Sequence, residues 1–213
     1  METPADTMRR FVYGNASLAE WQAQTGSSGE PWASFRRARD LVDAGTPDEA
    51  VAVWRQIALD DALEARQRLQ AWHFLRGAGQ VPPPESAKRV LGTVIEMPVE
   101  DAHDLLAAYD DGSARYLNQS GRVLVWEGSS AADVREAIAT WIEVGGVIAE
   151  RIGPWEEPTF PALPPHQLRL MMLTPSGPHF GQGPYAAMSE DEAVRSFTAA
   201  AGRVLELIVG HQG

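Results

Sequence analysis

The chain has 213 residues with 18 basic and 29 acidic side chains, so its formal net charge is −11, and it contains no cysteine. An apolar share of 44% is enough to bury a sizeable core, which excludes global disorder. The acidic balance repels phosphate backbones and argues against a nucleic-acid partner, and the absence of cysteine excludes disulfides and zinc sites that need sulfur.

Two further features predict the compartment. The N-terminus lacks the apolar segment of a signal peptide. The longest apolar-rich run, residues 137–149, is shorter than the ~20 residues needed to cross a bilayer. Together with the absence of cysteine, these features predict a cytoplasmic protein with no membrane partner.

The first 30 residues are polar and end in a run of glycine and serine at residues 26–29. Runs of this composition usually join a loosely docked segment to a folded body. We therefore predict that residues 1–30 form a mobile N-terminal segment, in which Phe11, Leu18 and Trp21 can still dock on the body.

Residues 31–84 have the apolar periodicity of helices. Thr46 is placed to cap a helix that has Pro47 at its first position and Glu49 at its third, which is the pattern of a capping box. A second apolar stripe ends at Gly77. We predict a helical subdomain over residues 31–84 with two antiparallel helices.

The periodicity changes from helical to alternating at the prolines of residues 82–84, so we place a boundary there and an α+β domain over residues 85–213. Turns rich in aspartate, asparagine and glycine separate the first strands into an antiparallel meander. Pro98 is expected to end the first strand. The strand of residues 168–173 has apolar residues on both sides, as in a central strand. The predicted strands are residues 91–97, 104–109, 113–118, 122–127 and 168–173, with a short return at His179 and Phe180.

Two long amphipathic helices complete this domain. Ser130 is predicted to cap a helix over residues 131–152, and Ser189 with Glu192 to form a capping box for a helix over residues 189–210. The predicted fold class is therefore α+β, with a helical N-terminal third packed with an antiparallel sheet of about five strands and these two helices covering the sheet.

The usual catalytic patterns are missing from the sequence. Asp110 and Asp111 precede a glycine, which is typical of a turn and not of a pair of catalytic carboxylates. Ser120 and Ser176 also precede glycines in turns, outside any Gly-x-Ser-x-Gly motif. The five histidines lack the spacing of metal ligands on a helix. We therefore predict no catalytic residue, no metal and no cofactor.

The segment of residues 115–121 is the most unusual, because it places planar hydrogen-bonding groups beside an aromatic ring close to a turn. A structural interpretation is that Asn118 supports the turn and Tyr116 packs across the sheet. The glycine-rich segment of residues 175–185 is a second candidate. We predict that any ligand site lies where these two segments meet.

Four residues would form that site. Arg115 supplies a cation that grips a carboxylate, Tyr116 an apolar face, Asn118 a donor and an acceptor, and His179 a group that titrates near neutral pH. Strand alternation places Arg115 and Tyr116 on opposite faces of the sheet. We favour the face that carries Tyr116 and Asn118.

The residues after Trp72 also carry a resemblance. Residues 111–127, 152–155 and 173–183 resemble an uncharacterised bacterial protein family of conserved-hypothetical sequences with no assigned activity. The hairpin of residues 109–126 is also similar to the sheet hairpins of PAS and profilin-like modules. The resemblance brings no activity and no assigned catalytic residue to transfer.

These features predict a non-enzymatic intracellular binding or adaptor module whose partner is another protein, since an acidic surface and seven tryptophans suit partner recognition. Two other classes stay open. One is a small-ligand-binding enzyme or sensor that uses the four residues above, and the other is an acidic inhibitor of a basic protein toxin. A pocket lined by the four residues favours the sensor, and an exposed apolar groove without them favours the adaptor.

Overall fold

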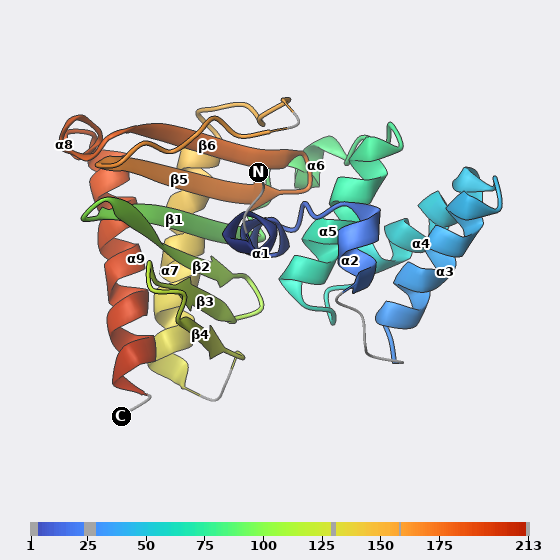
Figure 1. The fold of residues 1–213 in the computed structure, drawn as a ribbon, viewed down its shortest axis with the longest axis horizontal. Helices are drawn as coiled ribbons and strands as arrows, with labels where there is room; N and C mark the ends of the chain where they lie inside the picture. The colour runs from blue at the N-terminus through green and yellow to red at the C-terminus, as the bar shows by residue number, and fades with distance from the viewer. Residues whose placement is uncertain (1–3, 24–28, 129–130, 158, 212–213) are drawn as a thin grey trace. The chain divides into compact units, whose positions relative to one another are not determined.

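The computed structural model describes residues 4–23, 29–128, 131–157 and 159–211. The chain divides into two compact units, Met1–Ala87 and Lys88–Gly213, whose elements are labelled in Figure 1. The boundary falls shortly after the prolines at which the periodicity of the sequence changes.

The described part of the first unit is helical. Consecutive helices α3, α4 and α5 pack against one another, and their core is aromatic: the ring of Phe74 lies 5.3 Å from that of Trp54 and 6.2 Å from that of Phe35. The helices are α1 (Pro4–Tyr13), α2 (Leu18–Ala23), α3 (Trp32–Asp43), α4 (Pro47–Leu59), α5 (Ala65–Gly77) and α6 (Pro84–Ala87).

The chain between α1 and α2 is tied to α5. The buried side chain of Gln70 accepts a hydrogen bond from the Ala16 amide at 3.1 Å and donates one to the Ala16 carbonyl at 2.8 Å. The segment predicted to be mobile thus holds two helices and a buried anchor. Most of its glycine- and serine-rich run lies outside the described residues, and its mobility stays a prediction.

The capping box predicted at Thr46 is wrong. Thr46 does occupy the N-cap of α4, but its hydroxyl donates to the Leu41 carbonyl at 3.1 Å and does not cap the helix. The same carbonyl, at the end of the preceding helix, also accepts from the Thr46 amide at 2.9 Å, so both donors of Thr46 are directed to Leu41. The capping box occurs instead at the start of α5, between Glu64 and Gln67.

The second unit is built on an antiparallel sheet with the strand order β4-β3-β2-β1-β5-β6. The α+β class is confirmed, and β5 is an interior strand as expected, but the described sheet has six strands and not about five. The strands are β1 (Gly92–Val99), β2 (Ala102–Tyr109), β3 (Ala114–Leu117), β4 (Val123–Trp126), β5 (Gln167–Thr174) and β6 (Gly177–Pro184).

The two differences in the sheet both involve proline. Pro98 does not end β1 but lies within it, opposite His103 of β2. The return after the turn is a full eight-residue strand, β6, although it contains Pro178 and Pro184. An edge strand tolerates proline because one side of its backbone needs no ladder hydrogen bonds, and β6 is an edge strand.

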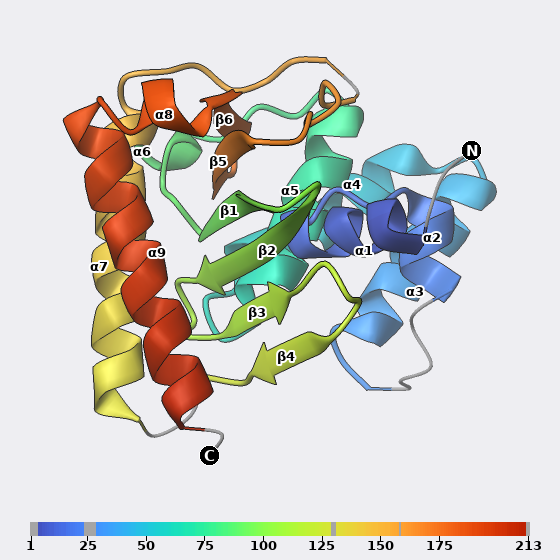
Figure 2. The ribbon, with the colours of Figure 1, turned by 60° about the vertical axis from the view of Figure 1, so that its left-hand side comes forward.

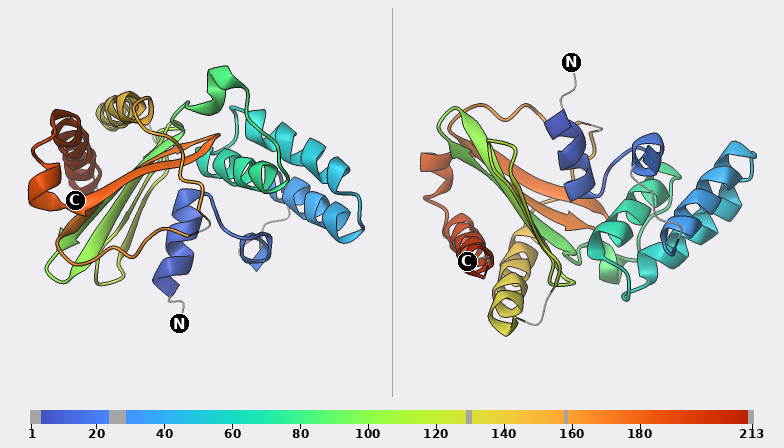
Figure 3. Two further views of the ribbon diagram at one scale, coloured as in Figure 1. Left: turned by 90° about the horizontal axis from the view of Figure 1, so that it is seen from above. Right: turned by 60° about the horizontal axis from the view of Figure 1, so that its bottom comes forward.

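Helices α7 (Ala132–Ala149) and α9 (Glu192–Gly210) run side by side over one face of the sheet (Figure 2), and Figure 3 shows both on the same side of the strands. The short helix α8 (Tyr185–Met188) lies between β6 and α9 in the chain. The rings of Trp141 and Phe197 meet edge to face at 5.3 Å where the two long helices pack. The core under them includes Ile95, Leu106, Ile138, Leu170, Met172, Ala201 and Val204.

The start of α9 also differs from the prediction. Its N-cap is Asp191, whose carboxylate accepts from the amides of Ala193 at 2.8 Å and Val194 at 3.2 Å. Ser189 ends α8 instead, so the predicted Ser189 capping box is wrong. A carboxylate accepts more strongly than a hydroxyl near a helix N-terminus, which explains the later start. Ser130, predicted to cap α7, lies outside the described residues.

A glycine seats α7 on the sheet. A Cβ atom at Gly145 would lie 2.7 Å from Thr93 Cγ2 and 3.3 Å from Met172 Cγ, which is closer than such atoms pack. A Cβ at the next residue, Gly146, would meet nothing within 4 Å. Gly145 therefore faces the sheet at close approach, whereas Gly146 faces open space.

These two glycines form a matched pair for mutation. Gly145→Ala gains about 1 kcal/mol of helix propensity but overpacks a stiff, buried contact, and we expect a net loss of about 1–2 kcal/mol in the free energy of unfolding. Gly146→Ala keeps the propensity gain, so we expect about 0.5–1 kcal/mol of stabilisation. Urea unfolding of both variants measures this, and shifts of the same sign would contradict the close approach.

Candidate functional site

The four residues predicted to form a ligand site are placed by β3, the β3–β4 turn and β6. Tyr116 lies on the face of the sheet that packs against α7 and α9, and its hydroxyl donates to the carboxylate of Asp104. Burial, and then this hydrogen bond, raise the pKa of Tyr116 to about 12. Its polar end is therefore used within the sheet, as in the structural interpretation.

Arg115 and Asn118 also serve the hairpin. Arg115 is buried, donates to the Trp126 carbonyl at 3.0 Å and forms an ion pair with Glu127 at 2.9 Å. The side-chain oxygen of Asn118 accepts three hydrogen bonds, from the amide and hydroxyl of Ser120 and from the amide of Arg122. Both side chains hold the β3–β4 hairpin together.

His179 lies elsewhere in the sheet. Strand β6 is separated from β3 by the three strands β2, β1 and β5, which amounts to four strand spacings or about 19 Å. The predicted convergence of His179 with Asn118 is therefore wrong. His179 is also fully buried, and burial lowers its pKa from the ordinary value of a histidine, which is the value that the expected titration near neutral pH assumed.

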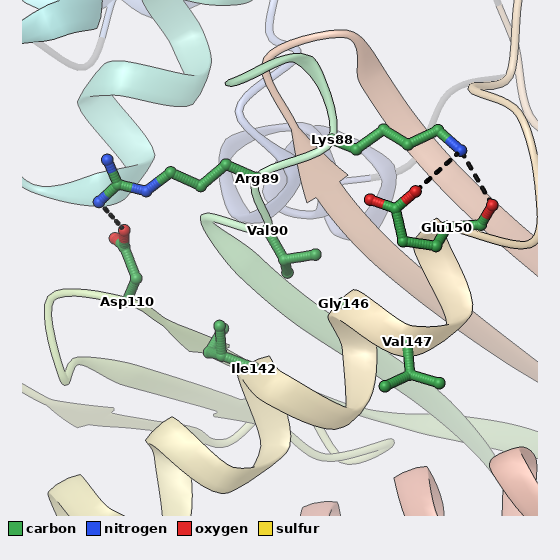
Figure 4. Close-up of a pocket in the computed structure, with 8 residues that line it drawn as sticks. All are labelled: Lys88, Arg89, Val90, Asp110, Ile142, Gly146, Val147 and Glu150. Atoms are coloured by element: carbon green, nitrogen blue, oxygen red, sulfur yellow. Dashed lines mark hydrogen bonds and ion pairs between the residues drawn. The ribbon is translucent and has the colours of Figure 1, made fainter. Parts of the chain in front are cut away.

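The structure forms a groove at a different place, beside α7 in the second unit (Figure 4). Its cavity volume is about 600 Å³, within the range of ligand sites. The residues come from the segment that leads into β1, the end of β2 and the outer side of α7. They are Lys88, Arg89, Val90, Asp110, Ile142, Gly146, Val147 and Glu150.

Two ion pairs border this groove, as Figure 4 shows. Lys88 Nζ lies 3.1 Å from the Glu150 carbonyl oxygen and 3.7 Å from its carboxylate. Arg89 pairs with Asp110 at 3.1 Å. Exposed pairs of this kind are worth about 0–1 kcal/mol, so a ligand exchanges partners with them at small cost.

Between the ion pairs the groove is apolar. Val90 and Ile142 contribute to its floor, and Gly146 leaves it open because it has no side chain. Val147 is 50% exposed and also lines a second hollow of about 400 Å³ near the start of α9, together with Val144 and Arg151. Val147 is thus an exposed apolar side chain that borders two hollows.

A third hollow lies in the first unit and has a cavity volume of about 610 Å³. Trp21 forms part of its wall, and the Trp21 ring lies 5.8 Å from that of Phe11 and 5.1 Å from that of Trp32. Neighbouring rings therefore pack against Trp21, which makes this wall part of the aromatic core. The pair Glu64–Arg66, at 2.9 Å, lies at the same hollow.

The three hollows contain none of the four predicted residues. Within the described ranges there is no cluster of histidine, aspartate and glutamate that could hold a metal ion. Among the helices in the described part of the chain, none combines the length and apolar character needed to cross a bilayer. Comparisons with protein-family models, curated proteins and solved structures find no match, so the resemblance to a bacterial family stays a prediction.

Sequence reasoning missed the groove, although two signals were present. Lys88 is the one lysine in the chain, and it stands directly before the first strand. Val147 falls outside the apolar stripe with which α7 faces the core. An apolar residue outside the buried stripe of a helix marks a candidate contact surface.

The roles of Asn118 can be separated by two variants. Asn118→Ala removes all three hydrogen bonds at the hairpin turn, and we expect a loss of about 1–2 kcal/mol in the free energy of unfolding. Asn118→Asp keeps an accepting oxygen, and we expect it to retain most of the stability. Urea unfolding at pH 7 compares them, and an Asn118→Ala variant as stable as the wild type would argue against a structural role.

Proposed function

We propose that the chain is a binding module, and that a partner protein docks on the outer face of α7. The observation that carries the proposal is Val147, a half-exposed valine at the border of two hollows. Covering an exposed apolar side chain with a partner lowers the free energy of the complex. The adjacent hollows can accept the partner's own side chains.

The surroundings of Val147 favour a protein over a small molecule. Lys88, Arg89, Asp110 and Glu150 place charges of both signs around an apolar centre. A polar rim around an apolar centre is the usual composition of a protein interface. Charged side chains of the partner can replace one member of each ion pair, while an apolar side chain of the partner enters the groove.

Charge narrows the chemistry of the partner. Residues 88–213 carry 9 basic and 17 acidic side chains, a net charge of 9 − 17 = −8. A field of this sign speeds association with a basic partner and slows it with an acidic one. We therefore propose a basic protein that presents an apolar side chain flanked by lysine or arginine. A basic protein toxin is one partner of this kind, and the chain would then be its acidic inhibitor.

The alternative of a small-ligand enzyme or sensor has less support. It depended on Arg115, Tyr116, Asn118 and His179 lining one pocket. His179 lies several strands away from the other three, and the polar ends of all four are bonded within the protein. The exposed apolar groove favours the adaptor.

Two valines of equal exposure test the proposal. Val147 is 50% exposed on α7, and Val209 is 51% exposed on α9 but lines neither hollow of the second unit. A photo-crosslinking residue placed at each position in turn should capture a basic protein from position 147 and not from position 209. With that protein purified, we expect Val147→Asp to weaken the Kd at least about tenfold and Val209→Asp to leave it unchanged.

Salt provides a second readout of the same complex. Electrostatic attraction predicts an association rate that falls as the ionic strength rises. Equal effects of the two aspartate variants, or capture from position 209 alone, would overturn the proposed surface.

A further inference from the structure

A chain of hydrogen bonds at the turn between β5 and β6 is not used by the proposed function. Ser176 Oγ lies 3.2 Å from His179 Nε2, and His179 Nδ1 lies 3.0 Å from the carbonyl oxygen of Ile152, just after α7. We infer that Ser176 is an activated hydroxyl with His179 as its general base, which makes this turn a site of acyl transfer onto serine.

The carbonyl of Ile152 decides which ring nitrogen carries the proton. A carbonyl oxygen only accepts, so Nδ1 of the neutral ring must donate to Ile152, and Nε2 is left as the acceptor that faces Ser176. Burial lowers the pKa of His179, which keeps the ring neutral near pH 7. A nucleophile, a base in hydrogen-bond reach and a third group that orients the base form the general arrangement of nucleophilic catalysis.

Thr174 is a second acceptor beside Ser176 and does not donate to it. The Thr174 hydroxyl donates to the Gly177 carbonyl at 2.8 Å, so its single proton is in use. Thr174 Oγ1 lies 2.9 Å from Ser176 Oγ and acts there as an acceptor. Ser176 has one hydroxyl proton, so it donates either to Thr174 Oγ1 or to His179 Nε2, and neither neighbour donates to Ser176 Oγ. Ser176 is also the partly exposed member of this group, whereas Thr174 and His179 are buried.

The charges that face His179 belong to the groove beside α7. Lys88 lowers and Glu150 raises the pKa of His179, and these two residues form one of the ion pairs at the groove. Because the charges are opposite and paired, burial remains the larger influence on the ring.

A second turn serine in the chain serves as the comparison. Ser120 also precedes a glycine, is exposed, and donates its hydroxyl to the side-chain oxygen of Asn118 at 2.8 Å. An amide oxygen does not remove a proton as an imidazole nitrogen does. If turn geometry and exposure alone set the reactivity toward an acyl donor, Ser120 would be at least as reactive as Ser176. A faster reaction at Ser176 therefore reports the effect of its imidazole base.

The chemical step balances without any additional reactant. Ser176 Oγ attacks the carbonyl carbon of an ester, a C–O bond forms, and the hydroxyl proton passes to His179 Nε2. The tetrahedral intermediate collapses, the bond to the leaving oxygen breaks, and that oxygen takes the proton from Nε2. The hydroxyl hydrogen of Ser176 is replaced by the acyl group, and the alcohol leaves.

The test uses p-nitrophenyl acetate as the acyl donor and the full chain. Peptide mapping by mass spectrometry should find acetyl transfer to Ser176 at least about tenfold faster than to Ser120, with Lys88 mapped in the same digest as an ordinary nucleophile. Ser176→Ala should abolish that adduct. His179→Asn should slow it about 100-fold, the usual contribution of a general base.

Ser120→Ala is the matched control, because it removes a turn serine that lies outside the Ser176–His179 pair. We expect this variant to retain the rate of acetyl transfer to Ser176, and the wild-type rate to fall as acid protonates His179. The ratio of the acetylation rates of Ser176 and Ser120 is measured in the wild type, so a folding defect of a variant does not affect it. A ratio of one or less, or an unchanged rate in His179→Asn, would overturn the inference. Val209→Asp, outside both hollows of the second unit, should leave the rate unaffected.

Discussion

The close contact between Gly145 and the sheet is the constraint on which the arrangement of the second unit depends. Helix α7 approaches β1 and β5 there because no side chain separates its backbone from Thr93 and Met172. The contact fixes the rotation of the helix, so Gly146 faces outward and Val147 is exposed. Three residues after the end of α7, the Ile152 carbonyl accepts from the ring of His179, and we expect the position of α7 to affect this contact. The groove and the hydrogen-bonded turn therefore depend on the same helix placement.

Local patterns were sufficient to predict the α+β class and the approximate position of each strand, because alternation and helical periodicity are properties of short segments. They were insufficient for the caps. Thr46 and Ser189 are typical capping residues, yet the Thr46 hydroxyl donates to the Leu41 carbonyl, and Asp191 caps α9 in place of Ser189. Such competition depends on which backbone or side-chain groups lie within hydrogen-bond distance. Strand β6 was underestimated because its prolines and glycines disfavour a strand, while an edge position tolerates them.

The candidate site shows the same limit more sharply. Asn118 and His179 both lie near turns, but β2, β1 and β5 separate β3 from β6 in the sheet, and no local pattern specifies this long-range pairing. Ser176 was assigned to a turn on its own and His179 to the predicted ligand site. Their separation of three residues across the turn was the signal that connects them, and the Ile152 carbonyl that orients the ring comes from a remote segment.

The ring proton of His179 tests most directly whether the seating of α7 organises this end of the unit. Nuclear magnetic resonance of the histidine ring nitrogens near pH 7 should find a slowly exchanging proton on Nδ1 and none on Nε2, in the wild type and in Gly146→Ala. In Gly145→Ala, which pushes α7 from the sheet, that proton should exchange faster because Ile152 moves away. A proton on Nε2, or identical exchange in the two alanine variants, would contradict the account.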